Sequence, residues 1–309
     1  MLKVNTKDFL SVTDFTKDEI LNIFKFTEML KKNLYNKKKQ NLLSGKTLAM
    51  IFEKSSTRTR VSFEAGMLQL GGHALFLNKN DIQLGRGEPI SDTAKILSRY
   101  VDCIMIRSLS HDTVVELAKN ATVPVINGLS DSFHPCQSLA DFFTIYEFKK
   151  KFRGVKLSYI GDGNNVANSL ILCSAMLGID ISVASPEKYM PDTKIVEKAY
   201  KLASNSGAKI NITPNINEAI KDSNFIYTDV WISMGEDSIA SDKKKDLAGY
   251  KITKELLYNC ADDCLIMHCL PAHRGEEIDA DVIDSDRSIV FDQAENRLHV
   301  QKAILCSLI

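Results

Sequence analysis

Apolar residues along this chain alternate between helical spacing and short continuous runs. Residues 15–20 combine a capping box with a hydrophobic staple, which is typical of a helix start, and helical spacing then continues to Leu34. An apolar run at 47–52 has the length of a buried strand. A polar turn at 55–60 follows it, and residues 61–70 carry a broad apolar stripe of helical period. This part of the chain therefore predicts helix, strand, turn and helix.

The same alternation continues along the rest of the chain. Gly154 and the basic residues before it interrupt the pattern, and we expect a domain boundary there. Strands that alternate with helices are typical of parallel sheets with helices on both faces. We therefore expect an α/β protein with two doubly wound parallel-sheet domains, at 1–148 and 149–293. Further helices are predicted at 113–119, 139–148 and 294–308, and strands at 103–107, 123–126, 156–160, 179–184, 209–213, 225–228, 264–268 and 289–291.

Composition and charge narrow the class of protein. The chain has 309 residues, of which 44% are hydrophobic and 25% charged, and 39 basic residues balance 39 acidic ones. No global field therefore attracts it to nucleic acid or membrane, and no apolar run approaches the ~18 residues that span a bilayer. The N-terminus lacks the apolar core of a secretory signal, and the seven cysteines have no framework of spacings. We expect a cytoplasmic protein.

The segment Ser56-Thr-Arg-Thr-Arg60 is the most informative one, because it lies where a predicted strand passes into a predicted helix. A helix N-terminus favours an anion through its dipole and its unpaired N–H groups. Guanidinium groups add planar, charge-assisted hydrogen bonds that suit phosphate. By itself, the segment also fits an ordinary Ser/Thr cap with solvent-facing arginines.

Two segments resemble nucleotide-binding motifs, but each lacks a residue that its motif requires. Ser44–Thr47 resembles the end of a P-loop, yet Gln40 stands where that loop needs glycine and no strand precedes it. Residues 161–166 follow a strand and precede a helix, as a dinucleotide fingerprint does, but the third glycine is missing. An NAD-dependent dehydrogenase therefore stays open as an alternative from a different class.

Three more polar segments follow predicted strands or turns, at 133–137, 229–235 and 267–274. Each places histidine, carboxylate, hydroxyl or thiol groups where a parallel sheet presents its ligands, although each alone is also a plausible loop. A zinc site is disfavoured, because the spacing of its possible ligands matches no common zinc pattern. These possible ligands are Cys260, Cys264, His268 and Cys269. We expect no metal and no organic cofactor.

Taken together, the four segments resemble the aspartate/ornithine carbamoyltransferase family, and its ornithine branch in particular. The family's Ser-Thr-Arg-Thr-Arg stands at 56–60, His-Pro-x-Gln at 134–137, Asp-x-x-x-Ser-Met-Gly at 229–235 and His-Cys-Leu-Pro at 268–271. The resemblance implies transfer of the carbamoyl group of carbamoyl phosphate to the δ-amine of L-ornithine, giving L-citrulline in arginine biosynthesis. A carbamoyltransferase for putrescine or N-acetylornithine, and a phosphate-binding regulatory module without activity, are further alternatives.

The resemblance also implies the residues of the site. Catalysis would involve Arg107 and His134, which polarise the carbonyl, and Cys269, which lies near the δ-nitrogen. Ornithine would be bound by Asn165, Asp229, Ser233 and Met234. Carbamoyl phosphate would be bound by Ser56, Thr57, Arg58, Thr59, Gln83, Arg107, His134, Pro135, Cys136, Gln137, Cys269, Leu270 and Arg297.

Two of these residues carry implications for assembly. The family's closing helix, here 294–309 with Arg297 near its start, packs back on the first domain and reaches the same ligand. Gln83 enters the site from a neighbouring subunit in the family. The resemblance therefore implies a homo-oligomer, usually a trimer, with shared active sites.

Overall fold

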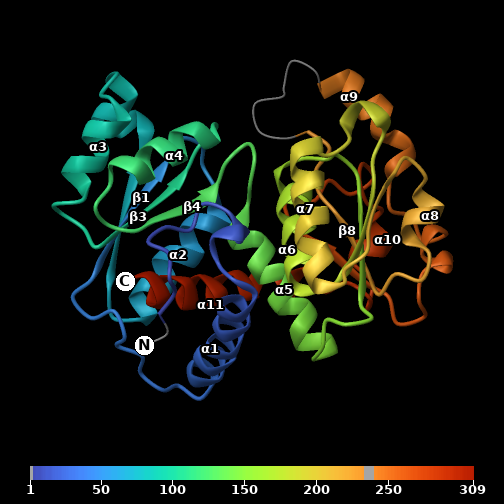
Figure 1. Cartoon of the computed structure of the whole chain (residues 1–309), viewed down its shortest axis with the longest axis horizontal. Helices are drawn as coiled ribbons and strands as arrows, with labels where there is room; N and C mark the ends of the chain where they lie inside the picture. Colours follow the sequence, from blue (N-terminus) through green and yellow to red (C-terminus); the bar gives the residue numbers. More distant parts are fainter. Residues whose placement is uncertain (1–2, 233–239) are drawn as a thin grey trace. The chain divides into compact units, whose positions relative to one another are not determined.

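The computed structural model describes residues 3–232 and 240–309. It contains two compact units, one formed by Met1–Phe143 with Glu295–Ile309 and the other by Thr144–Ala294. Each unit contains a parallel β-sheet with helices against it (Figure 1). Within the described ranges, no helix is both long enough and apolar enough to cross a membrane.

The first unit contains a four-stranded parallel sheet of order β2-β1-β3-β4. A buried cluster joins α3 and α4 to one face of this sheet through Ala49, Ile51, Ile104 and Ile106. The chain moves across the sheet in one direction from β1 to β2 and in the opposite direction from β2 through β3 to β4. Because such crossovers are right-handed, α2 lies on the opposite face from α3 and α4. The strands are β1 (Thr47–Phe52), β2 (His73–Asn78), β3 (Cys103–Arg107) and β4 (Val125–Leu129), and the helices that belong wholly or mainly to this unit are α1 (Lys17–Tyr35), α2 (Thr57–Gln69), α3 (Ile90–Leu97), α4 (His111–Asn120), α5 (Pro135–Lys149) and α11 (Val290–Leu308).

The C-terminal helix α11 packs back on the first unit, as expected. Lys302 Nζ donates to Gln69 Oε1 at 3.0 Å, and Arg297 Nη2 donates to Thr59 Oγ1 at 2.9 Å. Both bonds join α11 to α2. The end of the chain thus becomes part of the unit that holds the 56–60 segment.

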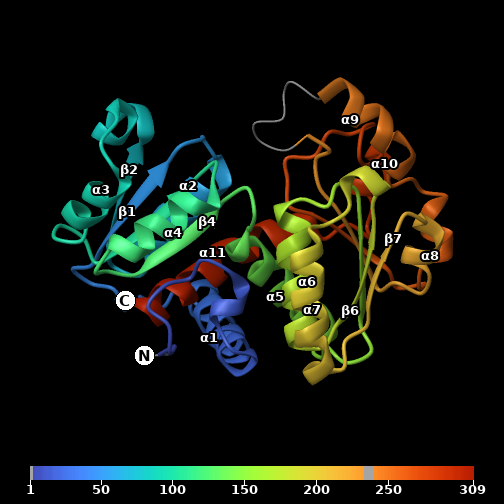
Figure 2. The ribbon, with the colours of Figure 1, turned by 45° about the horizontal axis from the view of Figure 1, so that its top comes forward.

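The second unit contains a five-stranded parallel sheet of order β7-β6-β5-β8-β9. Helices α6 and α7 pack together on one face, and α8 and α10 contribute to the buried cluster on the other (Figures 1 and 2). The strands are β5 (Lys156–Ile160), β6 (Asp180–Ala184), β7 (Ile210–Thr213), β8 (Phe225–Thr228) and β9 (Leu265–His268), and the helices are α6 (Asn165–Leu177), α7 (Thr193–Ser206), α8 (Ile216–Ile220), α9 (Ala240–Leu247) and α10 (Ala280–Ile283).

Strand order reverses direction between β1 and β3 in the first sheet and between β5 and β8 in the second. Ligands of doubly wound sheets bind beside such a reversal, at the carboxyl ends of the strands. The segment 53–60 follows β1, and Arg107 ends β3. Residues 161–165 follow β5, and Asp229 follows β8. The topology therefore brings the predicted chemistry to the ligand-binding edge of each sheet.

Some predicted elements were wrong or missing. Residues 289–291 are not a strand, because α11 begins at Val290. A short apolar run does not by itself distinguish a strand from the start of a helix. Strand β2 was not predicted, although residues 74–77 form a short apolar run; its residues are exposed or only half-buried. Strand β4 ends at Leu129, three residues beyond the prediction.

Candidate active site

The segment 56–60 forms the first turn of α2. Ser56 is its N-cap, and its Oγ accepts from Thr59 N–H at 3.3 Å. The first turn contains no acidic residue, so no side-chain carboxylate of this turn neutralises the positive end of the helix dipole. Thr59 is fully buried, whereas Thr57 is exposed and Arg58 half-buried. This end of α2 is suited to an anion.

Burial and the positive charges of three arginines lower the pKa of one histidine of the same unit. His134 has a pKa well below its usual value of 6.5, first because it is buried and then because Arg297, Arg107 and Arg58 repel its positive charge. Arg107 and Arg297 are themselves buried. His134 is therefore neutral near pH 7, with one N–H to donate. The cluster combines strong positive potential with a neutral hydrogen-bond donor, which suits an acyl phosphate.

Helix α5 supplies the remaining carbamoyl phosphate candidates of the first unit. Pro135 is the first residue of the helix, and Cys136 Sγ contacts Asn127 O at 3.5 Å. Burial raises the pKa of the Cys136 thiol to about 12, so this thiol is uncharged and unreactive. Gln137 is buried and its Nε2 donates to Asp141 Oδ1 at 2.8 Å. Asp141 was not singled out from the sequence.

Gln83 differs from the other candidates of the first unit. It is exposed, at the start of a 3-10 helix, Gln83–Arg86. Within residues 3–232 and 240–309, no hydrogen bond joins its side chain to the arginine cluster. This position leaves Gln83 accessible to another molecule.

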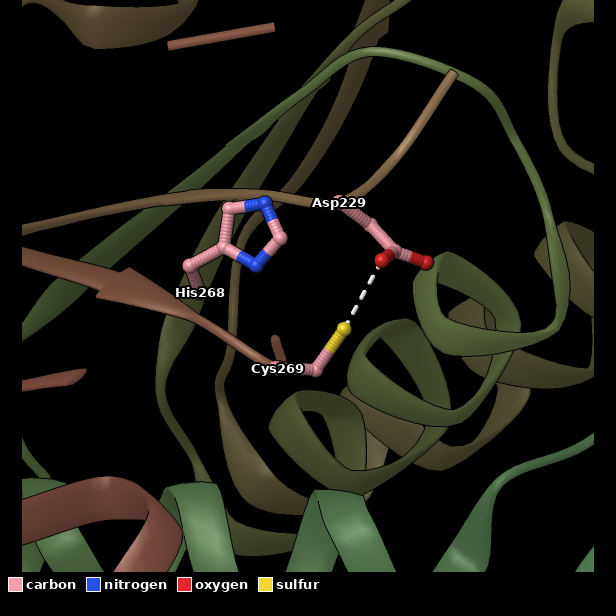
Figure 3. Close-up of side chains that lie close together, drawn as sticks. All are labelled: Asp229, His268 and Cys269. Atoms are coloured by element: carbon pink, nitrogen blue, oxygen red, sulfur yellow. Dashed lines mark hydrogen bonds between the residues drawn. The ribbon is translucent and has the colours of Figure 1, made fainter. Parts of the chain in front are cut away.

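In the second unit, side chains from the ends of three strands meet at Asp229. Asn164 caps α6 through its Oδ1, which accepts from Val166 N–H at 2.9 Å, and its Nδ2 donates to Asp229 Oδ2 at 2.9 Å. Cys269 Sγ donates to Asp229 Oδ1 at 2.8 Å, as Figure 3 shows. The carboxylate is only 6% exposed. Since its two oxygens are held by an amide and a thiol, its position is fixed.

The residue whose amide bonds to this carboxylate, Asn164, is not one of the predicted ornithine candidates. Asn165, rather than Asn164, was the residue expected near ornithine; it is half-buried at the first position of α6. The pair Asn164-Asn165 signals a helix cap, but the sequence does not show which asparagine caps and which faces outward. Ser233 and Met234 lie outside the described residues.

A buried pair behind Cys269 holds the following residue. His268 and Glu277 are both fully buried, and their Nε2 and Oε1 atoms lie 3.1 Å apart. His268 Nδ1 accepts from Leu270 N–H at 2.8 Å, so the ring proton is on Nε2 and is donated to Glu277. Leu270 has a φ of 58°, which is unusual for a residue with a side chain. Glu277 lies outside the polar segment 267–274, so the sequence did not predict its role.

Two groups of possible metal ligands occur in the described part of the chain. They are Asp229 with His268 and Cys269, and His273 with Glu276 and Glu277. In the first group both ring nitrogens of His268 are engaged, with Leu270 and Glu277. The Cys269 thiol is likewise directed at Asp229. These contacts explain the first group as a hydrogen-bonded arrangement. Cys260 and Cys264 belong to neither group.

Gly163, one of the two glycines that suggested a dinucleotide site, has a packing role. A Cβ on Gly163 would lie 2.3 Å from Pro191 N and 2.5 Å from Met190 C. Beside it, Asp162 accepts from Lys243 Nζ at 2.8 Å, and both side chains are buried. The backbone of 190–191 thus occupies the space that would have to admit a pyrophosphate at this glycine. This geometry disfavours the NAD alternative.

Known proteins match this chain over almost its whole length. The model for the carbamoyl-P binding domain of aspartate/ornithine carbamoyltransferase matches residues 7–147, and that for the Asp/Orn binding domain matches 153–308. The chain is 53% identical over 306 residues to an ornithine carbamoyltransferase of Bacillus anthracis, covering 99% of this chain and 95% of that one. It is 52% identical over 308 residues to one from Anoxybacillus flavithermus, covering 100% and 98%.

Solved structures show the same likeness. The ornithine carbamoyltransferase of Pyrococcus furiosus superposes with a TM-score of 0.95 at 52% identity, covering 99% of this chain and 97% of that one. The anabolic ornithine carbamoyltransferase of Campylobacter jejuni gives a TM-score of 0.91 at 43% identity, with 97% and 98% covered. The chain belongs to the aspartate/ornithine carbamoyltransferase family.

Proposed function

We propose that this protein transfers the carbamoyl group of carbamoyl phosphate to the δ-amine of L-ornithine, giving L-citrulline and phosphate. The observation that carries the proposal is the convergence of Arg58, Arg107 and Arg297 on the neutral His134. An acyl phosphate needs cations for its phosphate and a donor for its carbonyl oxygen, and this cluster offers both. The full-length likeness to ornithine carbamoyltransferases agrees with it.

The first unit binds carbamoyl phosphate in this proposal. Ser56, Thr57, Arg58 and Thr59 hold the phosphate at the N-terminus of α2, and Arg297 reaches the same place through its bond to Thr59. Arg107 and His134 direct N–H groups at the carbonyl oxygen. That oxygen gains negative charge when the amine attacks, and one donor of this kind lowers the barrier by about 3–4 kcal/mol.

The second unit binds ornithine. The fixed Asp229 carboxylate attracts the α-ammonium group, with Asn165 beside it and Ser233 and Met234 completing the set. The attacking δ-amine must be neutral. With a lysine-like pKa of ~10.4, its deprotonation costs about 4–5 kcal/mol at pH 7. Cys269, hydrogen-bonded to Asp229, steers the δ-nitrogen, and the proton that the amine loses passes to the departing phosphate.

Gln137 and the Leu270 carbonyl orient the carbamoyl NH2 group in this scheme, while Pro135 and Cys136 shape the wall of the site. The new C–N bond forms as the C–O bond to phosphate breaks. No covalent enzyme intermediate is needed. Domain assignments follow the same division, with 1–148 and 294–309 for carbamoyl phosphate and 149–293 for ornithine.

The setting of the reaction is also part of the proposal. We place it in the cytoplasm and in arginine biosynthesis, in keeping with the similarity to the Campylobacter jejuni protein described as anabolic. The exposed position of Gln83 supports a homotrimer in which that side chain completes a neighbouring site. Sizing of the protein in solution tests the assembly.

Product formation is the decisive test of the function. Ornithine, putrescine, N-acetylornithine and aspartate are offered in parallel with carbamoyl phosphate, and both substrates are varied for the best acceptor. Citrulline from ornithine should dominate. Binding of carbamoyl phosphate without turnover of any acceptor would contradict the proposal and favour a regulatory module.

A further inference from the structure

Asp141 is a buried carboxylate that faces a residue of the proposed carbamoyl phosphate site. It lies one helical turn after Gln137 on α5, so the two side chains share a face of the helix. Gln137 Nε2 donates to Asp141 Oδ1 at 2.8 Å, and both residues are at most 1% exposed. Because both belong to one helix, their contact is local.

The carboxylate determines which way the Gln137 amide points. The NH2 end of the amide faces Asp141, whose Oδ1 accepts its hydrogen bond, so the oxygen end of the amide is directed away from this carboxyl group. Gln137 Oε1 is buried and has no hydrogen-bond partner among the described residues. Leaving a buried acceptor unmatched is unfavourable, and a ligand N–H at this oxygen would remove that penalty. The amide oxygen is therefore an acceptor held ready for a donor.

This polarity distinguishes acyl phosphates from one another. The carbamoyl group carries an NH2 with two N–H donors, whereas the acetyl group of acetyl phosphate carries a methyl at the same position. Only the carbamoyl group can donate to Gln137 Oε1. A reversed amide would present its own NH2 and would oppose the carbamoyl NH2.

We propose that Asp141 is a positioning residue that makes the site select a carbamoyl donor over other acyl phosphates, by holding Gln137 with its oxygen toward the ligand. The inference rests on the proposed function. Asp141 is the seventh residue of α5, away from the unpaired N–H groups of the helix start, so capping does not explain a carboxylate there.

The test measures selectivity for the donor. In steady-state citrulline formation, the KM for carbamoyl phosphate and the competitive inhibition constant of acetyl phosphate give a discrimination ratio. Asp141→Asn should lower this ratio by about 3- to 10-fold, because the asparagine amide can donate as well as accept and no longer fixes Gln137. Inhibition by inorganic phosphate should change less than 2-fold. An unchanged ratio in folded Asp141→Asn would overturn the inference.

Two further variants separate positioning from general destabilisation. Asp102→Asn is the matched control, because Asp102 accepts from Lys46 and from Thr47 N–H at the amino ends of the strands; its ratio should equal that of the wild type. In a Gln137→Ala background, Asp141→Asn should change the ratio no further, and an independent additional effect would contradict action through Gln137.

The outcomes also separate this inference from the proposed function. If the wild-type protein forms no citrulline, the proposed function fails; if it forms citrulline but the ratio ignores Asp141, only the inference fails. Thermal unfolding checks each variant. Should Asp141→Asn not fold, Asp141→Ser gives the same comparison, since its hydroxyl can likewise donate or accept.

Discussion

Arg58 and Arg60 stand two positions apart in the first turn of α2, yet their surroundings differ. Arg58 is half-buried and lowers the pKa of His134. Arg60 is exposed, lies with its guanidinium 3.8 Å from the centre of the Phe76 ring, and pairs with Glu64 at 3.2 Å. Two identical side chains of one motif therefore have different surroundings, one near the buried His134 and one at the surface of its own unit.

Replacement of each arginine by alanine tests this difference. Arg58→Ala should weaken carbamoyl phosphate binding by about 100-fold or more, because it removes charge-assisted hydrogen bonds worth about 3 kcal/mol. Arg60→Ala, the matched control on the same turn, should change affinity less than about 3-fold, as exposed ion pairs are worth little. Calorimetry measures both, and equal losses would contradict the assignment.

In the proposed function, the choice of acceptor depends on Asp229. Asp229→Asn keeps the size of the side chain but removes the charge that attracts the α-ammonium group. We expect the KM for ornithine to rise about 10- to 100-fold, as one close charge pair is worth a few kcal/mol. Carbamoyl phosphate affinity should stay within about 3-fold of the wild type.

The control for this variant lies in the same unit. Asp180 accepts from Lys209 N–H at 2.8 Å at the other edge of the second sheet, so Asp180→Asn should leave both constants unchanged. A similar loss for both ligands in Asp229→Asn would show that the carboxylate has a structural rather than a binding role.

Among the elements, β9 is followed by a turn whose backbone is held by a side chain of the strand itself. Strand β9 ends at His268, whose ring links the buried Glu277 to Leu270 N–H. The ring therefore holds the backbone that offers the Leu270 carbonyl. The end of a strand sets the direction in which the chain leaves the sheet. The position of a residue beyond that end, such as Leu270, depends on a side-chain hydrogen bond.

Two substitutions of His268 separate these contributions. Asparagine offers an oxygen near the position of Nδ1 and can still accept from Leu270 N–H, whereas leucine cannot. His268→Leu should therefore lower kcat/KM for carbamoyl phosphate about 10-fold more than His268→Asn does, in line with the 1–3 kcal/mol cost of an unmatched buried N–H. Citrulline assays on folded variants decide this, and equal losses would exclude the positioning role.

For the whole molecule, the exposed Gln83 leads to a prediction about assembly. Gln83→Ala and Arg58→Ala should each reduce activity when expressed alone. If Gln83 completes the site of a neighbouring subunit, mixed oligomers contain some sites with both wild-type residues, and activity should return to a substantial fraction of the wild type. If Gln83 acts within its own subunit, every mixed site lacks one residue and no activity returns.

The control for mixing is simple. Mixed oligomers of wild type and Arg58→Ala should show only the activity of their wild-type share. Co-expression with two affinity tags isolates the mixed species. Activity that fails to return in tagged mixed oligomers would contradict shared active sites.

The sequence by itself determined the class of fold and the motifs on which the proposed chemistry rests. Apolar period distinguishes helix from strand wherever one face is buried, so β1, β3, β5 and β8 were all predicted within their observed regions. Strand β2 was not predicted because its apolar run, 74–77, is too short to distinguish a strand from a helix, and the run at 289–291 is likewise too short for its period to exclude helix. Motifs such as 56–60 combine residue type with a strand-to-helix junction, which is a local signal.

Only the tertiary structure decided which side chains act on one another. Arg297 reaches Thr59 across 238 positions of sequence, and Asn164 reaches Asp229 across 65. Glu277 and Asp141 acquire their importance from the atoms that they touch, among them Nε2 of His268 and Nε2 of Gln137. Local sequence sets the period of an element, whereas the direction of a buried polar group depends on a partner that folding brings to it.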